Sequence, residues 1–131
     1  MTVSRLLIAL GASLLAIATG LGAWASHGAE AMLDPAALRA FETGVDYQAV
    51  HSLGLVAVGI FGERIRGRKL AVVGSLLTVG ILFFCGGVYA SSLDGPGWIT
   101  SLAPIGGISL IVGWFALAVA VIIDRTGDRT P

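Results

Sequence analysis

Four stretches without Asp, Glu, Lys or Arg constrain this chain more than any other feature of its sequence. They cover residues 6–29, 47–62, 70–93 and 95–123. A helix needs about 20 apolar residues to cross ~30 Å of hydrocarbon, so the first, third and fourth stretches can span a membrane. Only 12% of the residues are charged and 56% are hydrophobic, whereas charged residues form about a quarter of a soluble domain. The chain is therefore expected to fold in lipid.

The second stretch is short, and its helix is expected to begin well before it. Asp34 followed by Pro35 is typical of an N-cap and a first helical position. We predict an all-α, integral membrane four-helix bundle that forms a single transmembrane domain over residues 1–131. Its helices are expected at about 6–26, 35–62, 70–93 and 100–123, the second with an amphipathic outer part.

The first helix has features of a secretory signal, because Arg5 precedes an apolar run that ends in Ala23-Trp24-Ala25. That run is longer than the roughly 7–15 residues of a signal core. We therefore expect the segment to be retained as the first spanning helix.

The distribution of basic residues predicts the orientation. An N-in, C-in arrangement places seven of the eight bases on the cytoplasmic side, as the positive-inside rule prefers. Those seven are Arg5, Arg64, Arg66, Arg68, Lys69, Arg125 and Arg129, and the outer one is Arg39. Interfacial aromatic residues agree with this orientation, since Trp24, Tyr47, Tyr89 and Trp98 fall near the predicted outer boundary. Trp114 lies mid-helix and is expected to pack against a neighbouring helix or lipid.

Small residues recur at helical spacing and predict close helix packing. The stripes are Ala12–Ala16–Gly20, Gly22–Ser26, Gly86–Ala90 and Gly106–Gly113. Packing within the bundle is favoured over a dimerisation face. Pro104, Gly106 and Gly107 predict a broken or reoriented start to the last helix. Residues 22–26 and 87–91 are weakly similar, which would fit an internal repeat.

Polar side chains gather near the outer end of the second helix. His51 is the one ionisable residue that lies clearly inside a spanning segment, where such groups are costly. Thr43 and Tyr47 share its stripe at four-residue spacing, and His27 lies at the outer end of the first helix. The predicted polar cluster consists of His27, Thr43, Tyr47, Gln48, His51 and Ser52.

Three interpretations of the polar cluster compete. The favoured one is structural, with hydrogen bonds that tie the helices and the first connection together. A metal site would use His27, His51, Glu42 and Asp46, whose types suit a divalent ion although their spacing matches no compact motif. A transport interpretation would make His51 a proton or substrate relay, but the third and fourth helices offer no ionisable partner.

Other functional classes are not expected. Cys85 lies in an apolar run without a basic neighbour, and Ser26 is adjacent to His27 without facing it, so neither residue predicts an enzyme nucleophile. A single cysteine permits no intramolecular disulfide. The net charge is zero, so the chain lacks the excess of basic residues that is typical of nucleic-acid-binding proteins. We expect no cofactor. The expected partners are membrane lipids, a second copy of the chain or another membrane protein.

Four motifs occupy residues 21–28, 43–51, 84–89 and 103–114. Together they resemble the YgdD/YwdK family of small membrane proteins, a family with a domain of unknown function that is similar to transmembrane protein 256. The family pattern G-A-F-G-A-H appears as Gly22-Ala23-Trp24-Ala25-Ser26-His27, and F-S-G-x-L-Y appears with Cys85 and Val88 in place of serine and leucine. The resemblance implies an inner-membrane protein with several spanning helices, and it does not supply an activity. It includes His27, Tyr47 and His51 among the motif residues without assigning them a role.

The sequence thus predicts a multi-pass protein of the bacterial inner membrane with a non-enzymatic structural, accessory or lipid-interacting role. The alternatives are a small transporter or channel subunit that uses the cluster around His51, and a metal-binding membrane protein.

Overall fold

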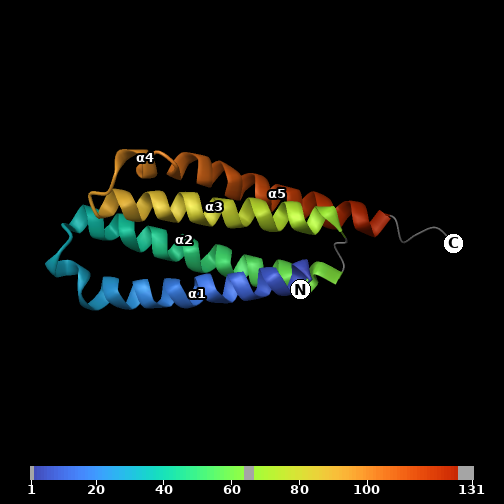
Figure 1. Cartoon of the computed structure of the whole chain (residues 1–131), viewed down its shortest axis with the longest axis horizontal. Helices are drawn as coiled ribbons and strands as arrows, with labels where there is room; N and C mark the ends of the chain where they lie inside the picture. Colours follow the sequence, from blue (N-terminus) through green and yellow to red (C-terminus); the bar gives the residue numbers. More distant parts are fainter. Residues whose placement is uncertain (1, 64–66, 127–131) are drawn as a thin grey trace.

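The computed structural model describes residues 2–63 and 67–126, which form only helices and the turns that join them (Figure 1). This confirms the all-α prediction. The four long helices are α1 (Val3–His27), α2 (Pro35–Ile60), α3 (Arg68–Ser92) and α5 (Ala103–Thr126). Three single turns accompany them, namely η1 (Ala29–Ala31), η2 (Phe61–Glu63) and α4 (Gly97–Thr100).

Local sequence signals account for the helix ends. The Asp34 side chain accepts hydrogen bonds from the backbone N–H groups of Ala36 and Ala37, and Pro35 occupies the first turn of α2, as the sequence predicts. The expected break near Pro104 is present, but it lies just before that residue. The short helix α4 ends at Thr100 and α5 begins at Ala103, so Pro104 stands in the first turn, where a missing N–H is tolerated.

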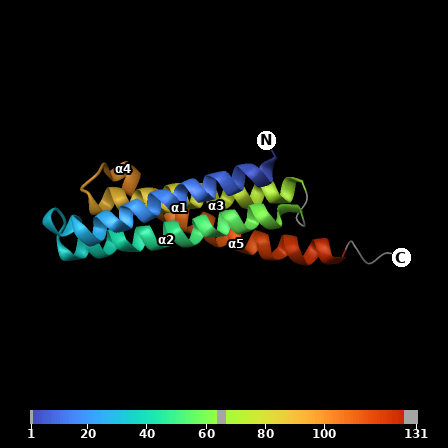
Figure 2. The same cartoon turned by 90° about the horizontal axis from the view of Figure 1, so that it is seen from below.

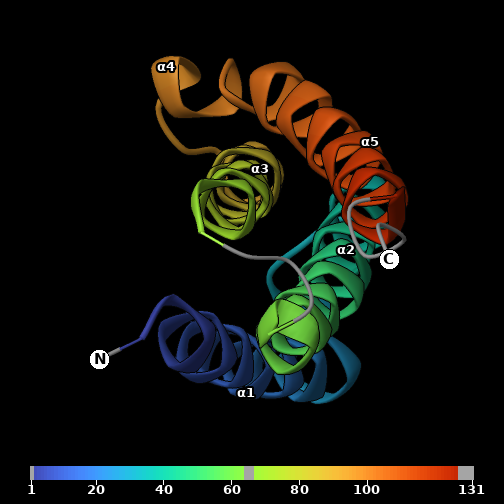
Figure 3. The ribbon, with the colours of Figure 1, turned by 90° about the vertical axis from the view of Figure 1, so that its right-hand side faces the viewer.

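The four long helices run side by side in alternating directions (Figures 1 and 2). α2 packs against α1 and α3, and α3 packs against α2 and α5, while α1 and α3 touch little. The start of α1, the α2–α3 connection and the end of α5 lie at one end of the bundle, and η1 and α4 lie at the other. Figure 3 looks along the helices from the first of these ends.

Glycines set how closely the helices approach. A Cβ atom on Gly106 of α5 would overlap the backbone nitrogen of Phe84 on α3, and one on Gly113 would lie 3.0 Å from Leu77. In α1, a Cβ on Gly11 would lie 2.7 Å from the carbonyl oxygen of Ser52. The predicted packing role of Gly106 and Gly113 is therefore confirmed.

The same prediction is wrong for two other stripes. Ala12, Ala16 and Gly20 lie on the exposed face of α1, and a Cβ on Gly20 would have no neighbour within 4 Å. Gly86 also points into open space, whereas its neighbour Gly87 packs against Ala103. Spacing along one helix identifies a shared face, but it does not determine which face meets a neighbouring helix.

Three segments are long and apolar enough to cross a membrane: α1, α3 and the stretch Gly97–Ile123, which includes α5. α2 is not among them, because its first half carries charged and polar side chains. Arg5, Arg68 and Lys69 lie at one end of the bundle, and Arg39 lies near the other. Arg64, Arg66 and Arg129 lie outside the described residues.

Candidate functional site: a polar cluster between helices

Gln48 connects three helices. It projects from α2, is 4% exposed, and donates a hydrogen bond from Nε2 to the carbonyl oxygen of Leu14 in α1 at 2.8 Å. Its Oε1 atom accepts a hydrogen bond from the hydroxyl of Tyr89 in α3, also at 2.8 Å. Both ends of the amide are therefore bound to neighbouring helices, which satisfies a polar group that would be costly to bury alone.

Three aromatic rings form a row that ends at Tyr89, the partner of Gln48. Phe41 of α2 lies between Trp24 of α1, with ring centroids 5.1 Å apart, and Tyr89 of α3, at 4.7 Å. Gly44 makes this approach possible, because a Cβ there would lie 2.7 Å from the Tyr89 ring. Trp24 and Tyr89, whose rings both lie against Phe41, occupy matching places in the similar segments 22–26 and 87–91.

His51 is held by its own helix and by aromatic rings. Its Nδ1 atom lies 2.6 Å from the carbonyl oxygen of Tyr47, and since a carbonyl only accepts, Nδ1 carries the proton. The imidazole stacks on the Tyr47 ring at 5.5 Å and lies 5.9 Å from the Trp114 ring of α5. Trp114 packs closely on α2, because a Cβ on Gly54 would lie 2.7 Å from its ring. The expected packing of Trp114 against a neighbouring helix is confirmed.

The threonine and the serine of the predicted cluster do not connect helices through hydrogen bonds among the described residues. The Thr43 hydroxyl donates to the carbonyl oxygen of Arg39 in its own helix at 2.9 Å. The Ser52 side chain is fully buried, and its Oγ has no hydrogen-bond partner among the described residues. An unmade hydrogen bond of this kind costs about 1–3 kcal/mol.

The four residues considered as metal ligands differ in how exposed their side chains are. His27, Glu42 and Asp46 have exposed side chains, whereas His51 is buried. Within the described part of the chain, no three His, Cys, Asp or Glu side chains form a group that could hold a metal ion.

Sequence reasoning missed Tyr89 and Leu14 as partners of Gln48. The sequence predicts Tyr89 to be an interfacial aromatic residue, and Leu14 contributes only its backbone carbonyl. One signal for Tyr89 is available, because Gly44 lies one turn before Gln48 and can admit a large ring from another helix. No signal in the sequence distinguishes the Leu14 carbonyl from others in α1.

Comparison with known proteins places the chain in a family. A family model described as "Protein of unknown function (DUF423)" matches residues 21–107, about two thirds of the chain. The chain belongs to this DUF423 family. The matched region of the DUF423 protein contains Phe41, Gln48, His51 and Tyr89, and it omits Leu14 and Trp114. The expected YwdK-like relationship is confirmed by this match together with a curated relative named YwdK.

Curated relatives of the DUF423 protein are named as membrane proteins. The chain is 32% identical over 119 residues to the UPF0382 membrane protein YwdK of Bacillus subtilis, covering 90% of the chain and 97% of the relative. It is 38% identical over 115 residues to the UPF0382 membrane protein SSP2132 of Staphylococcus saprophyticus, covering 88% and 95%. A UPF0382 membrane protein of Haemophilus influenzae is 36% identical over 99 residues, covering 75% and 78%. No solved structure matches the chain significantly.

Proposed function

We propose that this protein is a four-span component of the bacterial inner membrane with both termini in the cytoplasm and a non-enzymatic structural or accessory role. In this proposal the polar cluster of α2 holds the helices together and carries out no reaction. The observation that carries it is Gln48, whose amide is bound on one side to α1 and on the other to α3.

The position of α2 supports a fourth span. Its 26 residues correspond to a length of ~39 Å, and it lies between α1 and α3, both of which can span a membrane. The described charged side chains of α2, Arg39, Glu42 and Asp46, all lie in its first half. Tyr47, which follows them, contacts Phe84, with ring centroids 4.7 Å apart. Phe84 lies eight residues before the end of α3, and Arg39 lies eight residues before Tyr47, so in this antiparallel pair Arg39 is level with the end of α3 and Asp46 is the most deeply placed of the three charges.

The charge distribution supports the orientation. Arg5, Arg68 and Lys69 share one end of the bundle, whereas Glu30, Asp34 and Asp94 lie in or beside the connections at the other. Basic connections stay in the cytoplasm, so the first end is assigned to the inner side.

The state of the chemically capable side chains supports a non-enzymatic role. The Cys85 thiol is in the hydrophobic core, and the Ser26 hydroxyl donates to the Gly22 carbonyl of its own helix at 3.0 Å. The Nδ1 atom of His51 likewise donates to a carbonyl oxygen of its own helix, that of Tyr47. The Ser26 and His51 groups therefore bond within their own helices, and the Cys85 thiol is buried.

Stability and proton flux, measured on the same variants, test the proposal. Gln48→Leu removes both interhelical hydrogen bonds, and we expect it to lower the free energy of unfolding in detergent by about 1–2 kcal/mol. Thr43→Val, which removes a bond within one helix, is the matched control and should change it by less than about 0.5 kcal/mol. Liposomes that contain the wild type or His51→Gln, loaded with a pH-sensitive dye, should show equal proton flux.

Two results would overturn the structural role. Equal stability of Gln48→Leu and Thr43→Val would remove its main support. A proton flux that His51→Gln abolishes would favour the small transporter or channel subunit instead.

A further inference from the structure

A shallow apolar groove opens between the beginning of α3 and the end of α5. Its volume of about 350 Å³ lies at the lower end of the range for ligand pockets, about 300–1,000 Å³. Two basic side chains stand at its mouth, and short apolar side chains form its walls. The residues that matter here are Arg68 and Lys69 at the mouth and Val72, Val73, Ala116 and Ala120 in the walls.

The groove exists because α3 and α5 separate toward this end. Farther along the pair, Gly80 packs against Leu110 and Gly106 against the backbone at Phe84, which draws the helices together. Figure 3 shows α5 leading away from α3 as it approaches its C-terminal end. The short side chains of Ala116 and Ala120 leave the widening space unfilled.

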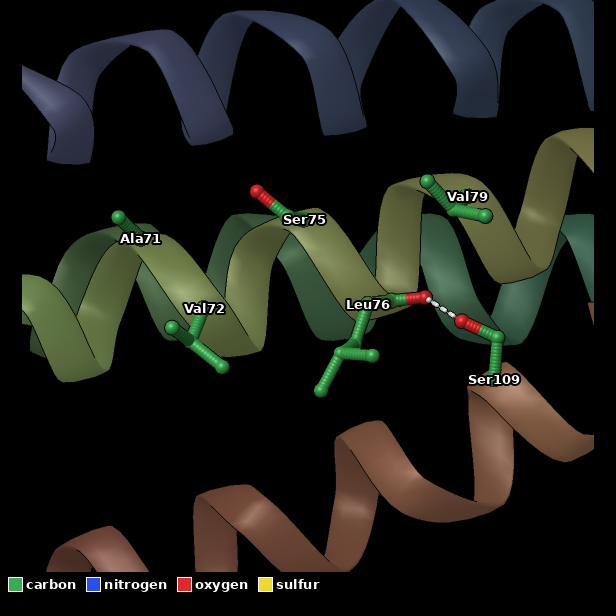
Figure 4. A pocket seen from close by; sticks show the side chains of 6 residues that line it. All are labelled: Ala71, Val72, Ser75, Leu76, Val79 and Ser109. Atoms are coloured by element: carbon green, nitrogen blue, oxygen red, sulfur yellow. Dashed lines mark hydrogen bonds between the residues drawn. The ribbon is translucent and has the colours of Figure 1, made fainter.

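A second hollow of about 360 Å³ extends the groove along the surface of α3 (Figure 4). It shares Val72 with the first and continues past Ser75 to Val79. At its edge, Ser109 of α5 donates a hydrogen bond to the Leu76 carbonyl at 2.7 Å, which occupies the donor of this hydroxyl. From residue 68 to residue 79, α3 rises by ~16 Å, about half of a ~30 Å hydrocarbon core. The groove therefore matches the depth of a single leaflet.

The mouth of the groove favours a negative charge. Arg68 and Lys69 are exposed there, and α3 begins at Arg68 with no acidic residue in its first turn and no side-chain hydrogen bond from its N-cap, Gly67. The backbone N–H groups of a helix start attract anions, and basic pockets between spanning helices on the cytoplasmic side bind lipid head groups. The basic mouth and the apolar walls thus follow one another in the same order as the head group and the acyl chains of a phospholipid.

We infer that this groove binds one anionic phospholipid of the cytoplasmic leaflet. The phosphate lies against Arg68 and Lys69, and one acyl chain follows α3 past Val72 toward Val79. The assignment to the cytoplasmic leaflet rests on the proposed orientation, whereas binding itself depends only on the groove and its charges.

Native mass spectrometry of the full chain in detergent tests this inference. With equal amounts of phosphatidylglycerol and phosphatidylcholine added, the wild type should retain one phosphatidylglycerol in preference to phosphatidylcholine. Arg68→Gln and Lys69→Gln should each weaken this retention about fivefold. Arg39→Gln removes a base from the opposite end of the bundle and should leave it unchanged.

The apolar part of the groove is tested by filling it. Ala116→Phe should displace the lipid, whereas Ala118→Phe, at an exposed position of the same helix, should not. Because Ala116→Phe could also impair folding, the wild type in liposomes provides a second test. Phosphatidylglycerol with a photoactivatable acyl chain should crosslink to the groove residues in preference to exposed apolar residues elsewhere, such as Ile17 and Leu53.

Equal retention of the two lipids, an equal loss in Arg39→Gln, or crosslinks spread evenly over the exposed apolar residues would overturn the inference. Retention in detergent does not depend on which end of the protein faces the cytoplasm. Failure of lipid binding would therefore leave the proposed topology intact, and a different topology would leave the binding result standing.

Discussion

The polar side chains of α2 differ in how their hydrogen-bonding groups are satisfied. Gln48 has partners on both sides, His51 bonds within its own helix, and Ser52 has no partner among the described residues. In hydrocarbon an interhelical hydrogen bond is worth about 0.6 kcal/mol on average, so Gln48 contributes modest energy. Its larger effect is to fix which faces of α1 and α3 meet α2.

Asp34, outside the predicted hydrocarbon, gives a pH-dependent prediction. The backbone N–H groups of Ala37 and Ala36 hold the pKa of its carboxyl below the usual value of 3.8. A lowered folded-state pKa means that the stabilisation is complete above about pH 4 and is lost as the pH falls through the folded-state pKa. Asp34→Asn keeps the cap but does not titrate. We therefore expect the stability of the wild type relative to Asp34→Asn to fall as the pH drops below about 4.

Thermal unfolding in detergent at a series of pH values measures this difference. A wild type that loses no stability relative to Asp34→Asn between about pH 6 and pH 3 would contradict the assigned cap. Asp34→Ala, which removes the cap, should be less stable than Asp34→Asn throughout.

The sequence allowed part of the polar cluster to be predicted. Spacing along one helix places Gln48 and Ser52 together, because both lie on a single face of α2. It could not supply the partner of Gln48, since Tyr89 is 41 residues away and its position depends on how α3 is rotated. The Asp34 cap was predictable because its partners are only two and three residues away.

α3 and α5 pack closely against each other, and glycine makes this possible. Gly80 and Gly87 of α3 and Gly106 of α5 each face an atom of the other helix so closely that an added Cβ would overlap it, and Gly113 of α5 makes a tighter contact than is usual for a Cβ. Lipid provides no hydrophobic force between helices, so such backbone contact must hold them together.

Gly106→Ala tests this contact at the level of the helix pair. Its new Cβ would overlap the backbone nitrogen of Phe84, and because backbone cannot rotate away, we expect a loss of about 1–3 kcal/mol in the free energy of unfolding. Gly86→Ala is the matched control, since its Cβ would enter open space and alanine favours helix. Denaturant unfolding in detergent measures both variants, and equal effects would show that the α3–α5 contact is looser than described.

Helix existence was predictable from the sequence, and helix contacts were only partly so. Charge-free runs indicate the four long helices, because length and apolarity are properties of each segment alone. The small-residue stripes predict a packing face in α5 but mislead in α1, where Ala16 and Gly20 point outward. Adjacent Gly86 and Gly87 also differ in their surroundings. Each residue of a helix is rotated by about 100° from the one before it, so Gly87 faces α5 while Gly86 faces open space.

At the scale of the whole molecule, the two proposed features lie at different levels of the bundle. Gln48 and Leu14 lie near the middle of α2 and α1, and the groove beside Arg68 lies at the end where α3 begins. The bundle is therefore joined by hydrogen bonds near its middle and opens between α3 and α5 at that end. This arrangement requires that α2 cross the membrane together with its neighbours.

Cysteine labelling of intact cells tests that requirement most directly. Met32→Cys and Asp94→Cys, each in a Cys85→Ala background, place one exposed thiol before α2 and one after α3. If α2 spans, both positions lie outside, and a membrane-impermeant maleimide should label both in intact cells, while Thr2→Cys should react only after permeabilisation. If α2 does not span, Met32→Cys and Asp94→Cys would be labelled from opposite sides of the membrane, and that result would contradict the four-span bundle.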